Sequence, residues 1–128
     1  MLRFARHKAT ADEAVDVSES NGVRALHLGS VTIQSAMRIK DPFALELTYT
    51  RAMMSFLLFG GKLQQILAIG LGGASLAKYV HAYCPDLHQT VIEINPRIIQ
   101  IARSQFYLPD NDARLEVIEG DGLRYLAD

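Results

Sequence analysis

The chain has 128 residues, 49% of them hydrophobic and 21% charged, with a formal net charge of -1 at pH 7. This length suits one globular domain, and the near-neutral charge excludes a broad basic surface for nucleic acid or anionic membrane. The longest apolar run, at 52–59, is too short to cross a bilayer, and no secretion signal is present. We therefore expect a cytoplasmic protein with neither nucleic acid nor membrane as partner.

Metal and disulfide sites are not expected from the residue types. Cys84 is the single cysteine, which excludes an intramolecular disulfide and a CxxC pair, and the four histidines lack metal-ligand spacing. We therefore predict no bound metal ion.

The first third of the chain predicts a loose leader and then a hairpin. Residues 1–14 have no regular pattern, and two alternating runs follow at 23–28 and 31–37. Gly29-Ser30 between these runs is a two-residue turn signal. We expect a β-hairpin unit over 15–40.

A helix is predicted over 43–59. Asp41-Pro42 combines a capping residue with a proline at the first helical position, apolar residues then recur at helical spacing, and Gly60-Gly61 ends the run.

The remainder alternates short apolar runs with helical stretches, which predicts a βαβαβ unit with a parallel sheet. This pattern assigns residues 41–128 to one α/β domain. Its expected strands are 66–69, 91–94 and 115–118, and its expected helices are 74–83 and 96–106.

Such a unit leaves part of its sheet uncovered. Both crossover helices lie on one face, and the strand at 66–69 becomes an apolar edge. We expect the gap to be filled by a missing C-terminal half or by formation of a homo-oligomer.

A glycine-rich turn follows the first parallel strand. Gly70 and Gly72 let the backbone turn and approach a nucleotide closely, because no β-carbon stands in the way, and Ser75 replaces the third glycine of the dinucleotide pattern. The alternative is a tight turn without a ligand.

Two acidic residues follow the next strands. Glu93, 21 residues beyond Gly72, can accept two hydrogen bonds from a ribose diol, or it is an exposed glutamate paired with Arg97. Asp121, before Gly122, can accept from an adenine amino group, or it caps a short helix. Together with the turn, they predict one ligand crevice at the carboxyl ends of parallel strands.

The order of these parts resembles the spermidine synthase family, the polyamine aminopropyltransferases, and in particular its divergent bacterial members. The likeness runs from about Val17 to the end of the chain, and a hairpin before the α/β core is its most telling feature. The similar stretches are 28–34, Tyr49, 69–73, 91–95 and 120–122.

The resemblance implies an α/β protein in which the hairpin precedes the first half of a methyltransferase-like Rossmann fold, apparently truncated. It implies a transferase of polyamine biosynthesis that moves an aminopropyl group to a small-molecule amine. The co-substrate is decarboxylated S-adenosylmethionine or S-adenosylmethionine, with no tightly bound cofactor. It implies Gln34 beside the thioether, Tyr49 at the substrate, Glu93 at the ribose, and Asp121 and Gly122 at the adenine.

Three departures from the family bear on activity. Gly73 replaces an aspartate that anchors the aminopropyl ammonium, and Thr50-Arg51 replaces a His-Glu pair. The general-base aspartate belongs to a fourth parallel strand, which this chain lacks. Enzyme activity is implied for the family, whereas for this chain we expect nucleoside binding and assign no catalytic residue.

Two other functions remain open. A methyltransferase using S-adenosylmethionine is favoured by Gly73, because the methionine carboxylate would then meet no negative charge. A non-catalytic nucleoside-binding or assembly module is favoured by the exposed apolar edge.

Overall fold

The fold is seen in a computed structural model that describes residues 14–29, 33–47, 64–72 and 74–127. It contains an antiparallel sheet, a parallel sheet and three helices in this part of the chain. The elements are β1 Val15–Ser20, β2 Val23–Leu28, β3 Ile33–Arg38, β4 Gln65–Ile69, α2 Ser75–Tyr83, β5 His88–Glu93, α3 Pro96–Gln105, β6 Leu115–Glu119 and α4 Gly122–Ala127.

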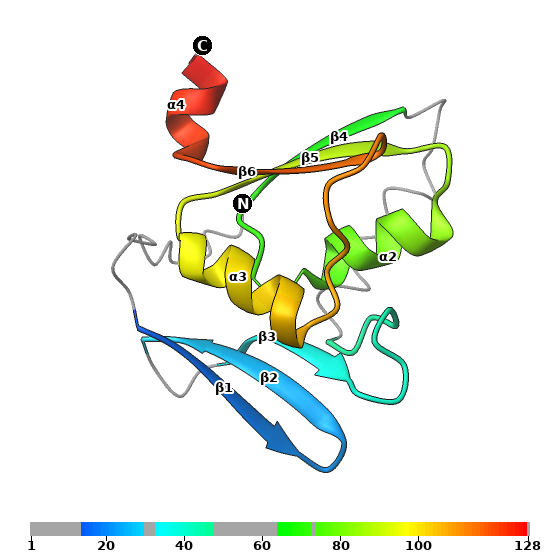
Figure 1. Ribbon diagram of the computed structural model, residues 1–128, viewed down its shortest axis with the longest axis vertical. Helices are drawn as coiled ribbons and strands as arrows, with labels where there is room; N and C mark the ends of the chain where they lie inside the picture. Colours follow the sequence, from blue (N-terminus) through cyan, green and yellow to red (C-terminus); the bar gives the residue numbers. More distant parts are fainter. Residues whose placement is uncertain (1–13, 30–32, 48–63, 73, 128) are drawn as a thin grey trace, which may run out of the picture.

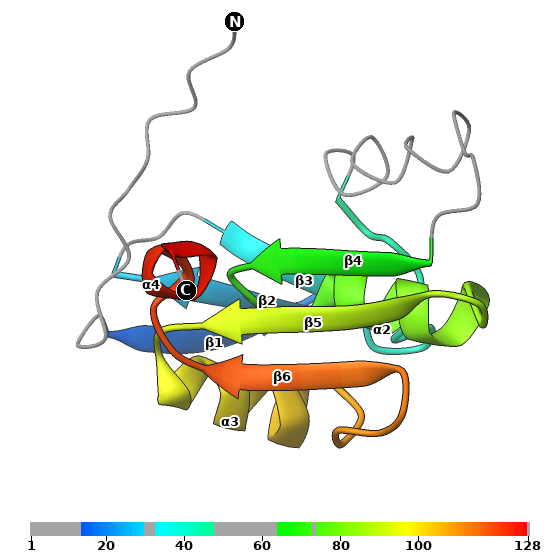
Figure 2. The same cartoon turned by 90° about the horizontal axis from the view of Figure 1, so that it is seen from above.

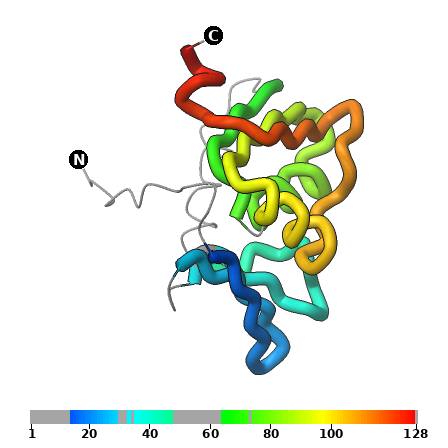
Figure 3. The backbone as a smooth tube through the Cα atoms, turned by 60° about the vertical axis from the view of Figure 1, so that its left-hand side comes forward, coloured from blue at the N-terminus to red at the C-terminus, as the bar shows by residue number. Residues whose placement is uncertain are grey.

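The described elements form three layers. Figure 1 shows the parallel sheet, then α2 and α3, then the antiparallel sheet, and the tube in Figure 3 shows α3 between the two sheets. The main core lies where these layers meet and includes Leu26 and Met37 from the antiparallel sheet, and Val91 and Leu115 from the parallel sheet. Phe106, after α3, is fully buried in this core, so one hydrophobic centre joins both sheets.

The antiparallel sheet has one strand more than the predicted hairpin. β2 and β3 pair antiparallel as expected, and β1 pairs with the other edge of β2, in the order β1-β2-β3. Asn21 and Gly22 connect β1 to β2 with φ angles of 51° and 77°. Asn-Gly is the residue pair that favours such a two-residue turn, so the signal for β1 was present in the sequence.

The predicted helix start at Asp41-Pro42 is wrong. Residues 42–47 form turns, bends and irregular backbone rather than a helix, and the rest of the predicted helix lies outside the described residues. Asp41 instead forms an isolated β-bridge with Arg38, whose side chain also bonds Glu46 at 2.9 Å. Leu45 is buried in a second apolar cluster, so tertiary contacts override the local helix-start signal here.

The parallel sheet confirms the βαβαβ prediction. Its order is β4-β5-β6, and α2 and α3 connect successive strands on the same face. β5 begins at His88, three residues before the expected strand, since Gln89 is buried and its amide donates to the Ala77 carbonyl at 2.8 Å. The strand ends at Glu93, one residue before the predicted end.

A polar contact ties the loop before β6 to α2. The carboxylate of Asp112 accepts a 2.6 Å hydrogen bond from the His81 ring and further bonds from the backbone amides of Arg114 and Leu115. The hydrogen bond from His81, with those amides, lowers the pKa of Asp112 to about 2. This loop is therefore held in place at the amino end of β6.

The face of the parallel sheet opposite α2 and α3 carries no described element except α4 near its carboxyl end. Figure 2 looks directly onto this open face. Leu67 and Ile69 on β4 are 43% and 54% exposed, as the bare face and edge predicted from the sequence require. No helix in the described ranges is long and apolar enough to span a membrane.

Candidate functional site

Glu93 joins the three predicted motifs at the carboxyl ends of the parallel strands. Its side chain bonds the glycine turn, because Leu71 N donates to Oε1 at 2.9 Å. Its backbone carbonyl accepts from Gly120 N, also at 2.9 Å. The turn after β4, the end of β5 and the turn after β6 are thus directly connected around one carboxylate.

The backbone of the glycine turn adopts left-handed conformations at alternate residues. Gly70, Gly72 and Ala74 have φ angles of 91°, 56° and 65°, and Gly70 N donates to the Ile92 carbonyl at 2.8 Å. No atom lies within 4 Å of a β-carbon built on Gly70. Gly70 is therefore required by its backbone conformation, and the space beside it is open to a ligand.

Glu93 is 4% exposed and its two oxygens are both engaged, the second by Asn95 N at 3.0 Å. The alternative of an exposed glutamate paired with Arg97 is wrong. A carboxylate has about four acceptor positions, so each oxygen of Glu93 keeps one for a further donor. The sequence did not reveal that this side chain also holds the turn in place.

Asp121 and Gly122 each have a structural role. Asp121 is exposed, and its Oδ1 accepts from Leu123 N at 2.9 Å, which is the helix-capping alternative. Gly122 is buried beneath Ile69, and a β-carbon on Gly122 would overlap the Ile69 side chain. The glycine is thus required by close packing of α4 against β4.

We expect Gly122→Ala to lower the free energy of unfolding by about 1–2 kcal/mol, because the added methyl group forces Ile69 to move. In an Ile69→Ala background the same change is expected to cost almost nothing, since the overlapping atoms are gone. A double-mutant cycle measured by urea denaturation checks this coupling. Equal costs in both backgrounds would show that the two residues do not press on each other.

Ser75, in the place of the third glycine, connects the turn to the antiparallel sheet. Its hydroxyl lies 3.0 Å from that of Ser35, and both residues are buried. Ser35 follows Gln34 in β3, so the bond holds this strand against the start of α2. The sequence showed Ser75 as a departure from a pattern but did not reveal its partner.

Two buried polar groups near the turn lack a hydrogen-bond partner within the described residues. The Asn95 side chain caps α3 through Oδ1, which accepts from Arg97 N at 3.0 Å, while its Nδ2 is unpaired. Lys78 on α2 is 1% exposed, and its Nζ lies 5.9 Å from the centre of the Phe106 ring. Desolvation lowers the pKa of Lys78 to about 8.

Some predicted site residues lie outside the described part. These are Tyr49, Thr50, Arg51 and Gly73, while Gln34 belongs to β3 without a described side chain. Where residues are described, no group of three or more His, Cys, Asp or Glu side chains could hold a metal ion.

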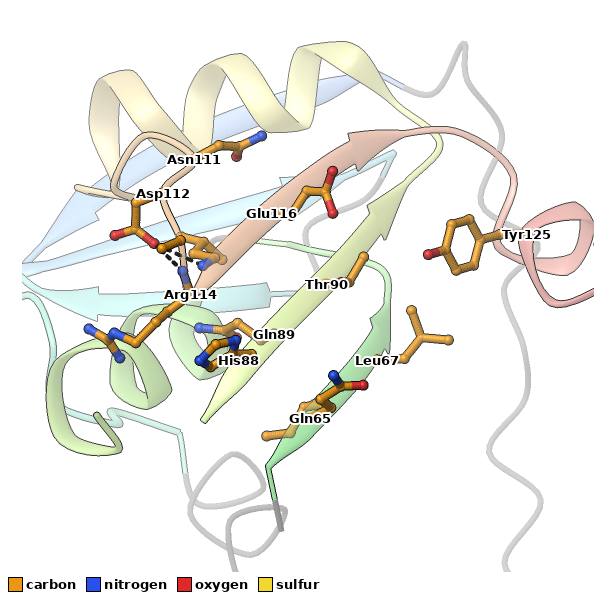
Figure 4. Close-up of a pocket in the computed structure, with 13 residues that line it drawn as sticks. Gln65, Leu67, His88, Gln89, Thr90, Asn111, Asp112, Arg114, Glu116 and Tyr125 are labelled. Carbon is orange, nitrogen blue, oxygen red and sulfur yellow. Dashed lines mark hydrogen bonds between the residues drawn. The ribbon is translucent and has the colours of Figure 1, made fainter. Parts of the chain in front are cut away.

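A groove of about 750 Å³ lies on the open face of the parallel sheet, away from the site around Glu93. Figure 4 shows its lining side chains, among them Leu67, Thr90, Glu116 and Tyr125, rising from the three strands and from α4. Gly70, Gly72, Glu93 and Asp121 do not line it, so it is a separate feature of the fold.

Comparison with known proteins identifies relatives by sequence. No protein-family model matches the chain. The polyamine aminopropyltransferase of Neisseria meningitidis serogroup A is 49% identical over 113 residues, covering 88% of this chain and 43% of the relative. That of Chromobacterium violaceum is 45% identical over 129 residues, covering 98% of this chain and 49% of the relative. The chain therefore spans less than half the length of these curated relatives.

Solved structures show the same fold. A probable spermidine synthase from Corynebacterium glutamicum superposes with a TM-score of 0.71 at 18% identity, over 98% of this chain and 47% of that one. Human methyltransferase-like protein 13, solved in complex with SAH, gives a TM-score of 0.59 at 30% identity, over 63% of this chain and 39% of that one. The α/β core with its preceding antiparallel sheet is thus of the spermidine synthase and methyltransferase type.

Proposed function

The chain is a divergent spermidine synthase-like protein, and on that premise we propose that it binds an S-adenosyl nucleoside at the site around Glu93. The proposed ligand is decarboxylated S-adenosylmethionine or its product methylthioadenosine, exchanged freely rather than tightly bound. The single observation that carries the proposal is the buried Glu93 carboxylate beside the open Gly70 turn.

Glu93 suits a ribose because the hydroxyls of the sugar are donors and the carboxylate accepts. Two of its acceptor positions face backbone amides, and those bonds fix the carboxylate where the turn leaves space. Asp121 and Gly122 would then lie toward the adenine, with Gln34 near the thioether and Tyr49 near the substrate. These four roles come from the family resemblance and are part of the proposal.

The proposed reaction of the complete protein is aminopropyl transfer to a small amine. The neutral amine attacks the carbon next to the sulfonium, and the carbon–sulfur bond breaks with its electrons passing to sulfur. A carboxylate on a further strand takes the proton released from the new ammonium. No residue of this chain is assigned as the proton acceptor, so the proposed activity belongs to a protein in which a further strand supplies that carboxylate. We place that protein in the cytoplasm, where the lone Cys84 stays reduced.

A methyltransferase is the second candidate. Human methyltransferase-like protein 13 is 30% identical over the aligned part, and its structure contains SAH. Gly73 would leave the methionine carboxylate free of a nearby negative charge. Comparing the affinities of S-adenosylmethionine and its decarboxylated form separates the two candidates, since an aminopropyltransferase is expected to prefer the decarboxylated one.

Isothermal titration with methylthioadenosine tests the proposed site. We expect binding to the chain and an affinity at least about tenfold weaker for Glu93→Gln, because an amide cannot accept from both hydroxyls and both backbone donors. Glu119→Gln, the same change at the exposed end of the neighbouring strand β6, is the control and should bind like the original chain.

Folding of each variant is checked by circular dichroism before titration, so that lost binding is not confused with lost structure. Unchanged affinity in a folded Glu93→Gln variant would remove the ribose role from this residue. An equal loss of affinity in both variants would show that the effect comes from the overall charge of the chain and not from the site.

A further inference from the structure

Polar contacts join the antiparallel sheet to both crossover helices, which lie between the two sheets (Figure 1). At the start of α2, the Ser75 hydroxyl lies 3.0 Å from the Ser35 hydroxyl of β3. At the end of α3, the guanidinium of Arg24 in β2 donates to the Gln105 carbonyl. α3 has 10 residues, so its end lies about 15 Å from its start beside Glu93. The serine contact therefore adjoins the site around Glu93, whereas the arginine contact does not.

The start of α2 has little support from its own residues. Ala74 occupies the N-cap position, and its side chain has no acceptor for the free amides of the first turn. Its φ angle of 65° is a conformation that residues with a β-carbon rarely adopt. Such a strained backbone persists only where the surrounding structure fixes it, and Ala74 is 0% exposed. The start of this helix therefore depends on contacts from other elements.

β3 supplies contacts on both sides of Ala74. After it, Ser75 bonds the Ser35 hydroxyl and also donates to the Ala36 carbonyl at 3.4 Å. Before it, the Ser35 β-carbon lies 3.8 Å from the position of a β-carbon built on Gly72. Both serines are buried, so water does not compete for their hydrogen bond. Ser35 thus contacts the glycine turn and the first residue of α2 at once.

We propose that Ser35 and Ser75 are positioning residues, which hold the glycine turn in the conformation that the nucleoside requires. Glu93 fixes this turn from β5 through the Leu71 amide, and the two serines fix it from β3. Both serines act through the turn and not by contact with the nucleoside. This role rests on the proposed function for its link to the nucleoside. It makes the antiparallel sheet part of the binding site, and it gives a reason for a hydroxyl at a position where the dinucleotide pattern has glycine.

A double-mutant cycle separates positioning from simple stabilisation of the fold. Ser35→Ala or Ser75→Ala alone leaves a buried hydroxyl without its partner, so each is expected to lower the midpoint of urea denaturation. The double variant has neither hydroxyl, so its midpoint is expected to return toward that of the original chain. Affinity should not return with it. Isothermal titration with methylthioadenosine is expected to give about three- to tenfold weaker binding in the single variants and in the double variant alike.

Hydrogen exchange of the Leu71 amide, measured without ligand, reports on the turn directly. We expect this amide to exchange at least about tenfold faster in the double variant, because the bond that holds the turn against β3 is absent. Arg24→Met is the control, since it removes the contact at the far end of α3. It should lower the urea midpoint and leave both the Leu71 exchange rate and the affinity close to those of the original chain.

Recovery of affinity together with the urea midpoint in the double variant overturns the proposal, because the serines would then only stabilise the fold. An unchanged Leu71 exchange rate in that variant overturns it too, as does an equal loss of affinity in Arg24→Met. If the double variant does not fold, the Leu71 exchange rates of the two single variants give the same decision. If the original chain does not bind methylthioadenosine, the proposed function fails, and the Leu71 exchange rate still decides whether the serines hold the turn.

Discussion

Lys78→Met is expected to raise the free energy of unfolding by about 2–3 kcal/mol at pH 7. Lys78 is 1% exposed and its ammonium has no hydrogen-bond partner in the described part of the chain. Burial lowers the pKa of Lys78 from 10.5 to about 8, and each pKa unit corresponds to about 1.4 kcal/mol. The cation–π contact with Phe106 offsets only about 1 kcal/mol of this burial penalty, because the ring centre is 5.9 Å from the charge. Methionine keeps the length of the side chain without the charge.

The gain should depend on pH in a direction that follows from this shift. Between pH 8 and 10.5 the folded state has released the proton of Lys78 while the unfolded state still holds it. The penalty of the lysine is therefore complete below pH 8 and disappears as the pH rises toward 10.5. The difference between variant and original chain should shrink over the same range.

Urea denaturation at pH 7, 9 and 10.5 measures both effects. Lys40→Met, the same change at an exposed position, is the matched control and should stay within about 0.5 kcal/mol at every pH. A Lys78→Met variant that is less stable than the original chain at pH 7 would show that the ammonium has a favourable partner.

Glu93→Gln is expected to cost about 2 kcal/mol of folding stability without any ligand, and Glu93→Ala about 4. The carboxylate accepts from the amides of Leu71 and Asn95, and it is almost completely buried. Glutamine has one acceptor oxygen and leaves one amide unpaired, whereas alanine leaves two. An unpaired buried donor costs about 1–3 kcal/mol.

Urea denaturation ranks these variants, with Glu119→Gln as the control that should be close to neutral. Hydrogen exchange adds a local readout, because the Leu71 amide should open more easily in Glu93→Gln. If Glu93→Gln were as stable as the original chain, the carboxylate would not stabilise the turn. Ligand binding alone would then explain why a carboxylate is buried there.

The sequence by itself determined the features that depend on local geometry and on alternation. The βαβαβ order follows from apolar runs of strand length between helical stretches, and the structure confirms it. The turn at Gly70 and Gly72 follows from the positive φ angles that glycine adopts without strain. Asn21-Gly22 is a turn signal of the same kind and connects β1 to β2.

Only the tertiary structure decided the features that depend on partners distant in the chain. Asp41-Pro42 does not begin a helix, because Arg38 holds Asp41 and Glu46 while Leu45 is buried. The serine at position 75 is explained by its hydrogen bond to Ser35, forty residues earlier. The local sequence around each of these residues does not identify the residue that it contacts in the folded chain.

The burial of Lys78 and the bonds along the outer edge of β6 also depend on residues that are distant in the chain. Lysine is normally exposed, so nothing local predicts that Lys78 would be buried beside Phe106. Asn111 and Asp112 bond the outward backbone groups of Val117 and Leu115 because the loop returns along β6. Such outcomes are set by packing free energies summed over the whole fold, which no short window of sequence contains.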